Sequence, residues 1–159
     1  LLLAKRLAAL VECQPPGNVI GQGIGALLPG QGDSFAGRRH GIVVAPSRDA
    51  HIYCYLQDEN AKVMRFFPNR FAKDSLVGAA APLELPGRMR FQLVMNGQGV
   101  KETVMCFATP QDVLADLPTR VVGTDFEALP VASLDVIRDA FKAATRGAAA
   151  QETFHVQAK

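Results

Sequence analysis

Tryptophan is absent from this chain of 159 residues, which has only two tyrosines, three cysteines and a net charge of +2. So small a net charge does not predict the basic face of a nucleic-acid-binding domain, and the scarcity of Trp and Tyr argues against a platform on which bases stack. No window approaches the roughly 18 uninterrupted apolar residues of a membrane span. We therefore expect no nucleic-acid partner and no membrane span in this fragment.

The three cysteines, at positions 13, 54 and 106, lack the spacing of a zinc site, and no paired histidines accompany them. We therefore expect no metal and no cofactor. Cys54 and Cys106 both fall in predicted strands, where a cysteine is either a small buried hydrophobe or half of a disulfide. A bridge between Cys54 and Cys106 requires neighbouring or facing strands and would leave Cys13 unpaired.

Residues 49–67 predict a β-hairpin with a polar turn at 58–60. In its first strand apolar residues alternate with His51, Tyr53 and Tyr55 at a period of two, which predicts two distinct faces. The tyrosine face either forms an outward binding surface, with Arg65 opposite, or packs under flanking helices. The sequence leaves both alternatives open.

The hairpin ends at Phe66-Phe67-Pro68-Asn69. Pro68 has no N–H and cannot continue a central ladder, whereas the Asn69 side chain can bond to its own backbone and close a turn. We expect this turn to be structural first. Arg70 and Phe71 lie past it and are predicted to be free to face a partner.

The alternating strands predict a mainly β fold, an antiparallel sandwich of immunoglobulin-like or curled form, with helices at both ends. We expect an amphipathic helix over residues 1–16, a glycine-rich connector over 17–37 and a β-sandwich domain over 38–159, with helices near 110–117 and 133–146. A closing strand follows at 153–158, and Asn96-Gly97 predicts a second hairpin. The predicted core comprises Ile52, Cys54, Leu56, Phe66, Phe91, Leu93, Val104 and Cys106.

Residues that could support catalysis are sparse. His51 and Asp49 share one face of a strand and form at best a weak dyad, whereas His51 and Cys54 fall on opposite faces. The segment 21–25 contains three glycines at alternate positions, but no helix can follow it as a phosphate-binding loop requires. We expect no catalytic residue.

Residues 49–55 and 63–71, with 77–79, 85–86 and 97–108, resemble a bacterial family of domains of unknown function. The shared features are a Tyr-rich strand, a Phe-Pro-Asn turn, a Leu-Pro step and a later hairpin, over about residues 37–118. Asn60-Ala61 departs from the family, which usually has a glycine turn there. The resemblance implies an accessory module found beside kinase, caspase-like, envelope or secretion domains, and it assigns no catalytic residue.

The sequence and the resemblance together predict a non-enzymatic binding domain of a bacterial cell-envelope or secretion-associated protein, located in the periplasm or envelope. The chain starts without methionine, so we expect it to be part of a longer protein. The alternatives are a regulatory appendage of an intracellular, cytoplasmic kinase or protease and, last, a hydrolase around His51 and Asp49. The predicted partner surface comprises Tyr53, Tyr55, Arg65, Asn69, Arg70 and Phe71.

Overall fold

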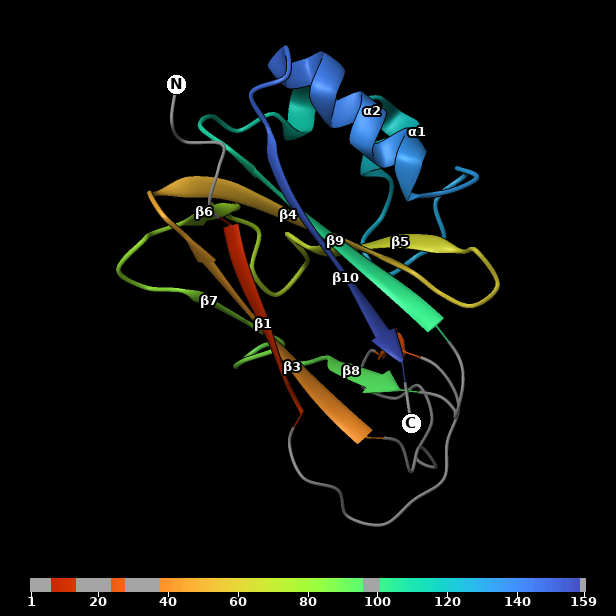
Figure 1. Cartoon of the computed structure of the whole chain (residues 1–159). Coiled ribbons are helices and arrows are strands. Elements are labelled where there is room, and N and C mark those ends of the chain that lie inside the picture. Colours follow the sequence, from red (N-terminus) through yellow and green to blue (C-terminus); the bar gives the residue numbers. More distant parts are fainter. Residues whose placement is uncertain (1–6, 14–23, 28–37, 96–100, 158–159) are drawn as a thin grey trace.

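The computed structural model describes residues 7–13, 24–27, 38–95 and 101–157, and these form two five-stranded antiparallel sheets and a small helical layer (Figure 1). The first sheet has the order β1 (Leu7–Cys13), β3 (Arg38–Pro46), β8 (Gln92–Met95), β2 (Ile24–Leu27), with β7 (Leu83–Leu85) also paired to β3. The second has the order β10 (Ala150–Gln157), β9 (Lys101–Thr109), β4 (Ala50–Gln57), β5 (Val63–Phe67), with β6 (Leu76–Val77) also paired to β4. Between β9 and β10 lie the 3-10 helix η2 (Leu114–Asp116), α1 (Thr119–Val122) and α2 (Leu134–Thr145).

The second sheet is the middle layer, because both faces of its central strands are buried. Successive side chains of a strand point to opposite faces. On β4 and β9 the even-numbered residues pack toward the first sheet, and the odd-numbered residues pack toward the helices. The first core therefore contains Ile52, Cys54, Leu56, Val104 and Cys106, and the second contains Tyr53, Tyr55, Met105 and Phe107.

The core between the two sheets agrees with the sequence prediction. Seven of the eight predicted residues are buried there: Ile52, Cys54, Leu56, Phe66, Phe91, Val104 and Cys106. The backbone of Leu93 lies in β8, but its side chain is outside the described residues. The alternating pattern was sufficient here because each of these strands turns one apolar face toward the opposite sheet.

The second core forms where α2 lies on the tyrosine face of β4. Phe141 of α2 stacks on Phe107 at 4.1 Å between ring centroids, with Tyr53 and Tyr55 at 5.2 and 6.0 Å from it. Ser133 begins the helix by accepting a bond from the Asp135 N–H. The helix predicted near 133–146 is therefore present, and of the two alternatives for the tyrosines the structure shows burial beneath it.

The disulfide between Cys54 and Cys106 crosses the middle of the second sheet. The two residues lie directly opposite each other in the β4–β9 register, with Cα atoms 4.2 Å apart. The bond closes a loop with a sequence separation of 52 residues, which in the chain-entropy picture adds about 4 kcal/mol to the free energy of unfolding.

The predicted N-terminal helix is wrong over residues 7–13, which form β1 and pair along their whole length with β3. A short helix has little stability of its own, so pairing along an available strand outweighs it. The predicted connector is also corrected at Ile24–Leu27, which is strand β2 beside β8. The other residues of 1–16 and 17–37 lie outside the described residues.

Two further predictions near β9 are wrong. β8 pairs with β2 and β3 in the first sheet, whereas β9 pairs with β4 and β10 in the second, so they do not form a hairpin. The predicted turn at 96–97 lies outside the described residues. No α-helix occupies 110–117: Thr109 ends β9, its hydroxyl donates to the Gln111 carbonyl, and a single 3-10 turn follows. The predicted closing strand is present as β10, which begins earlier, at Ala150.

A count of free thiols tests the pairing of β4 with β9. We expect one reactive thiol per chain, that of Cys13, in the denatured and unreduced protein, because Cys54 and Cys106 are bonded to each other. The same protein reduced before denaturation is the control and gives three. Three thiols in the unreduced sample would contradict the bridge.

Candidate functional site

The Phe-Pro-Asn turn is closed by the side chain of Asn69. Its Nδ2 donates to the Phe66 carbonyl at 2.8 Å, and its Oδ1 accepts the N–H groups of Phe71 and Ala72 at 2.8 and 3.0 Å. The Phe67–Pro68 peptide bond is cis. Asn69 is buried, at 4% exposure, so its role is to hold the turn together. The prediction that it belongs to the partner surface is wrong.

The guanidinium of Arg65 lies behind this turn and is also buried. It donates to the carbonyls of Val122 at 3.0 Å and Gly123 at 3.4 Å, and through Nη1 to the carbonyl of Pro68. Arg65 therefore ties β5 and the turn to the C-terminal end of α1. The prediction that it lies on the surface opposite the tyrosines is wrong.

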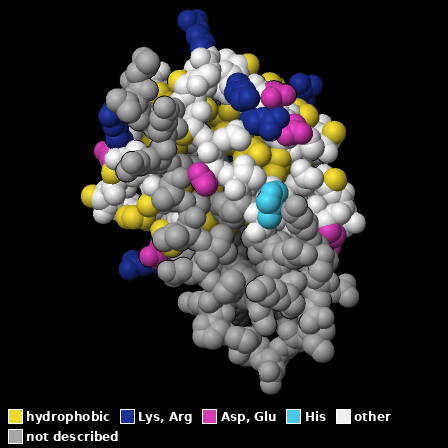
Figure 2. All heavy atoms as spheres, viewed as in Figure 1, with side chains coloured by type: hydrophobic (Ala, Val, Ile, Leu, Met, Phe, Trp, Pro, Cys, Tyr) yellow, Lys and Arg dark blue, Asp and Glu magenta, His cyan; other side chains and the backbone are white. Residues whose placement is uncertain are grey.

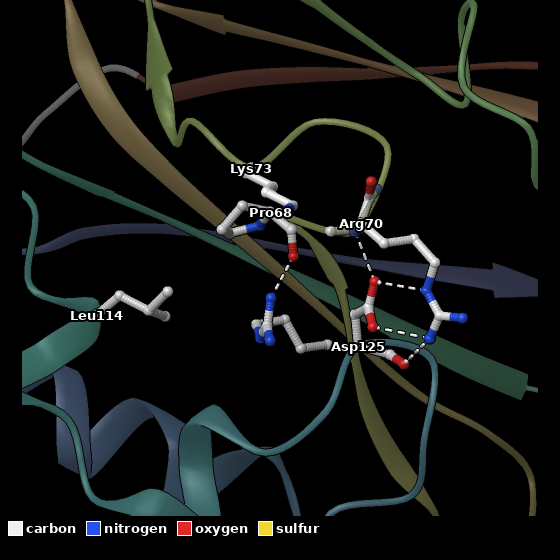
Figure 3. Close-up of a pocket in the computed structure, with 7 residues that line it drawn as sticks. Pro68, Arg70, Lys73, Leu114 and Asp125 are labelled. Atoms are coloured by element: carbon white, nitrogen blue, oxygen red, sulfur yellow. Dashed lines mark hydrogen bonds and ion pairs between the residues drawn. The ribbon is translucent and has the colours of Figure 1, made fainter.

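Asp125 is the anchor for Arg70. Its Oδ2 accepts the backbone N–H of Arg70 at 2.6 Å, and its Oδ1 accepts Nη2 of the same residue at 2.9 Å. The guanidinium also lies 5.8 Å from the centroid of the Phe126 ring. Arg70 is exposed as predicted, but it is not free, because both its backbone and its side chain are bonded to Asp125 (Figure 3).

The Arg70 contacts change the acidity of Asp125. Burial raises the pKa of its carboxyl, but hydrogen bonds from the Arg70 side chain and backbone, with the charges of Arg70 and Arg65, outweigh this and hold the pKa below its usual range. In turn the Asp125 carboxylate raises the pKa of the Arg70 guanidinium. The pair is therefore charged near neutral pH.

A hollow of about 240 Å³ lies between the turn and the chain after α1. In Figure 3, Lys73 lies beside Pro68 at one side, Leu114 lies across from them, and the Arg70–Asp125 pair forms another wall. The lining residues are Arg65, Pro68, Asn69, Arg70, Lys73, Leu114 and Asp125. Three cationic side chains thus face one carboxylate.

Phe71 is the exposed member of an aromatic cluster next to this hollow. It is 37% exposed and stacks on Phe91 at 6.5 Å with an interplanar angle of 13°, while Phe126 lies 6.2 Å away. Phe91 itself is buried and packs against Phe126 at 5.0 Å. The exposed ring is therefore held on a buried base.

Of the predicted partner surface only Arg70 and Phe71 are exposed. Tyr53 and Tyr55 are 0% exposed, and their hydroxyls donate to the Asp112 carboxylate and the Val121 carbonyl. Burial is the main cause that raises the pKa of both tyrosine hydroxyls above their usual value. The period of two identified their shared face but gave no sign that α2, eighty residues later, covers it.

His51 and Asp49, which the sequence offered as a weak dyad, each bind another partner. His51 Nδ1 lies 2.7 Å from Ser75 Oγ, whereas Asp49 Oδ1 accepts the N–H of Ala79. The Asp112 carboxylate lies near His51, because it accepts a hydrogen bond from the Tyr53 hydroxyl. That bond lowers the pKa of the Asp112 carboxyl. Sequence reasoning missed the Ser75–Asp112 neighbourhood, because these residues follow no local pattern.

Other site classes find little support in the described part of the chain. It contains no group of three or more His, Cys, Asp or Glu residues that could hold a metal ion. Among its helices none is long and apolar enough to cross a membrane. On the face in Figure 2, the described charged side chains of both signs are interspersed rather than gathered into a patch of one sign.

Replacement of Asn69 tests whether the turn is structural. We expect Asn69→Ala to lower the free energy of unfolding by about 1–3 kcal/mol, because a buried carbonyl and two N–H groups lose their partner. Asn60→Ala, at an exposed position of the β4–β5 turn, is the matched control and should change stability by less than about 0.5 kcal/mol. Equal denaturation midpoints for the two variants would contradict the assignment.

The Arg70–Asp125 pair predicts a pH dependence of stability. The folded pKa of Asp125 lies below the unfolded value of about 3.9, so the stabilisation is complete above that value and is lost as pH falls through the folded pKa. The melting temperature of Asp125→Asn should therefore lie below that of the wild type near neutral pH and approach it below about pH 4. Glu59→Gln, at an exposed turn position, should show no such convergence; a gap for Asp125→Asn that stays constant with pH would refute the prediction.

The comparisons with known proteins support a family and no more. No curated protein and no solved structure matches the chain. A family model described as a domain of unknown function, DUF4384, matches residues 25–112, which is more than half of the sequence. The matched region runs from β2 through β9 and includes the Phe-Pro-Asn turn, Arg65, Arg70 and Phe71. The chain therefore belongs to the DUF4384 family.

Proposed function

We propose that this chain is a non-enzymatic accessory domain that acts through contacts with a partner protein. The observation that carries the proposal is the position of Phe71, a ring 37% exposed to solvent and stacked on a buried aromatic base. Aromatic side chains are enriched at the energetic centres of interfaces, because they bury a large area.

The surroundings of Phe71 support this role because they are already ordered. Arg70 is held by Asp125 and lies against Phe126, and Asn69 fixes the backbone of Phe71. Binding therefore costs little additional side-chain entropy at this surface. Arginine beside an aromatic ring is also a typical composition of a binding surface.

The absence of a catalytic role is part of the proposal and rests on how the Ser75 neighbourhood is used. Ser75 is buried, at 4% exposure. The Asp112 carboxylate already accepts bonds from the Tyr53 hydroxyl and the Leu114 N–H. His51 lies 2.7 Å from the Ser75 hydroxyl, but the bonds of Asp112 go to Tyr53 and Leu114, so we assign this group of residues to holding β4, β6 and the chain after β9 together rather than to catalysis.

We further propose that the parent protein is bacterial and that the domain works in the periplasm or cell envelope, beside secretion or envelope machinery. The Cys54–Cys106 disulfide supports an oxidising compartment, where such bonds persist. A cytoplasmic regulatory appendage of a kinase or protease would instead keep these thiols reduced, so the redox state of the two cysteines in cells separates the alternatives.

Site-specific photo-crosslinking tests the proposed binding surface. A photoreactive phenylalanine analogue replaces Phe71 in the full-length protein, and the cells are irradiated. We expect a discrete adduct with one partner from position 71. Controls with the analogue at the exposed positions of Glu59 and Lys142 should not give it. The same set of adducts from all three positions, or none from position 71, would contradict the proposal.

A further inference from the structure

We infer that the hollow beside Phe71 binds a carboxylate side chain of the partner, presented by a segment with an apolar residue next to it. The inference rests on the proposed function and adds the chemistry of the partner. Three observations carry it: the charge of the hollow, the donors of Arg65 and the size of the space.

The charge balance of the hollow favours an anion. Among the described residues, Arg65, Arg70 and Lys73 line it together with one carboxylate, that of Asp125. Because Asp125 forms its ion pair with Arg70 at 2.9 Å, the charges of Arg65 and Lys73 remain in excess. Glu127, which also acts electrostatically on Arg70, does not line the hollow.

Arg65 adds a buried guanidinium to the lining of the hollow. Its three hydrogen bonds in the described structure go to backbone carbonyl oxygens, and they use three of the five N–H groups of a guanidinium. The residue is 8% exposed, so an oxygen atom that enters the hollow meets a fixed, largely desolvated cation. Hydrogen bonds between charged groups are stronger and shorter than neutral ones, which suits a carboxylate.

The size of the space and its walls define the occupant. A volume of about 240 Å³ is smaller than the roughly 300–1,000 Å³ of small-molecule sites, and it suits one side chain. Pro68 and Leu114 offer apolar contact to its methylene groups, while Lys73 stands at the side (Figure 3).

Arg70 connects this hollow to the aromatic cluster. It lines the hollow and also lies 5.8 Å from the Phe126 ring, which packs with Phe71. A partner segment that places an acidic side chain in the hollow can therefore place its neighbouring apolar side chain on Phe71. The chemistry that fits is a glutamate or aspartate adjacent to a leucine or an aromatic residue.

A peptide titration followed by NMR tests the inference on the protein itself. The probes are two acetylated and amidated hexapeptides, Gly-Leu-Glu-Leu-Glu-Gly and the same sequence with glutamine in place of glutamate. We expect the glutamate peptide to shift the amide signals of Arg70 and Lys73, and to bind more weakly as salt rises. Lys73→Gln should weaken its binding about two- to fivefold, as expected for an exposed ion pair.

The matched comparisons separate a carboxylate contact from other causes. Lys73→Gln should leave the binding of the glutamine peptide unchanged, and Lys62→Gln, an exposed lysine in the β4–β5 turn, should change neither titration. Wild-type melting temperatures for both variants establish that the fold is intact. Equal binding of the two peptides, an equal effect of Lys73→Gln on both, or no shift at Arg70 and Lys73 would overturn the inference. Photo-crosslinking at position 71 is independent of these titrations, so the proposed function can survive that result or fail separately.

Discussion

A single buried guanidinium, that of Arg65, joins three parts of this domain. Its bonds reach the carbonyl of Pro68 in the turn and those of Val122, at the end of α1, and Gly123, just after it. The chain held in this way also covers the outer edge of β5, since Phe126 and Leu129 donate to the carbonyls of Arg65 and Val63. An open edge strand is thus covered, and Asp125 is brought to the turn where it binds Arg70. Both the hollow and the exposed ring of Phe71 depend on this arrangement.

The middle sheet gives the same segment a firm base. Because β4 is buried on both faces, its even-numbered residues stabilise the contact between the sheets, and its tyrosines stabilise the contact with α2. The disulfide joins β4 to β9 within this layer. β5 extends from β4 through the hairpin, so the turn and Arg65 are attached to the most enclosed part of the molecule. A rigid support of this kind is what a preorganised binding surface requires.

The sequence predicted those features of the fold that are determined by neighbouring residues. The alternation on β4 and β9 gave most of the inter-sheet core, and Ser133 with the apolar stripe after it gave α2. The role of Asn69 in the turn followed from its own chemistry. By contrast, β1 looks amphipathic as a helix, and only its pairing with β3 makes it a strand. The apparent hairpin at 96–97 failed because β8 and β9 pair in different sheets.

Only the part of the candidate site that depends on neighbouring residues was predicted from the sequence. Arg70 and Phe71 are exposed because they follow a turn that the sequence identifies. Arg65, read as a surface residue from its place in the strand, is buried because carbonyl groups 57 and 58 residues away accept its bonds. Asp125 is 55 residues from Arg70, and no spacing rule connects them. The hollow consists of these long-range contacts, so only the folded chain reveals it.

The conservative replacement Arg65→Lys tests the central role of this guanidinium most directly. Lysine keeps the positive charge but cannot present the planar fork that reaches three carbonyl oxygens. We expect the free energy of unfolding, measured by chemical denaturation, to fall by about 2–4 kcal/mol, and the amides of Phe126 and Leu129 to exchange faster with solvent. Arg120→Lys, at an exposed position of α1, should change stability by less than about 0.5 kcal/mol. An Arg65→Lys protein with wild-type stability and unchanged exchange at Phe126 and Leu129 would contradict the account.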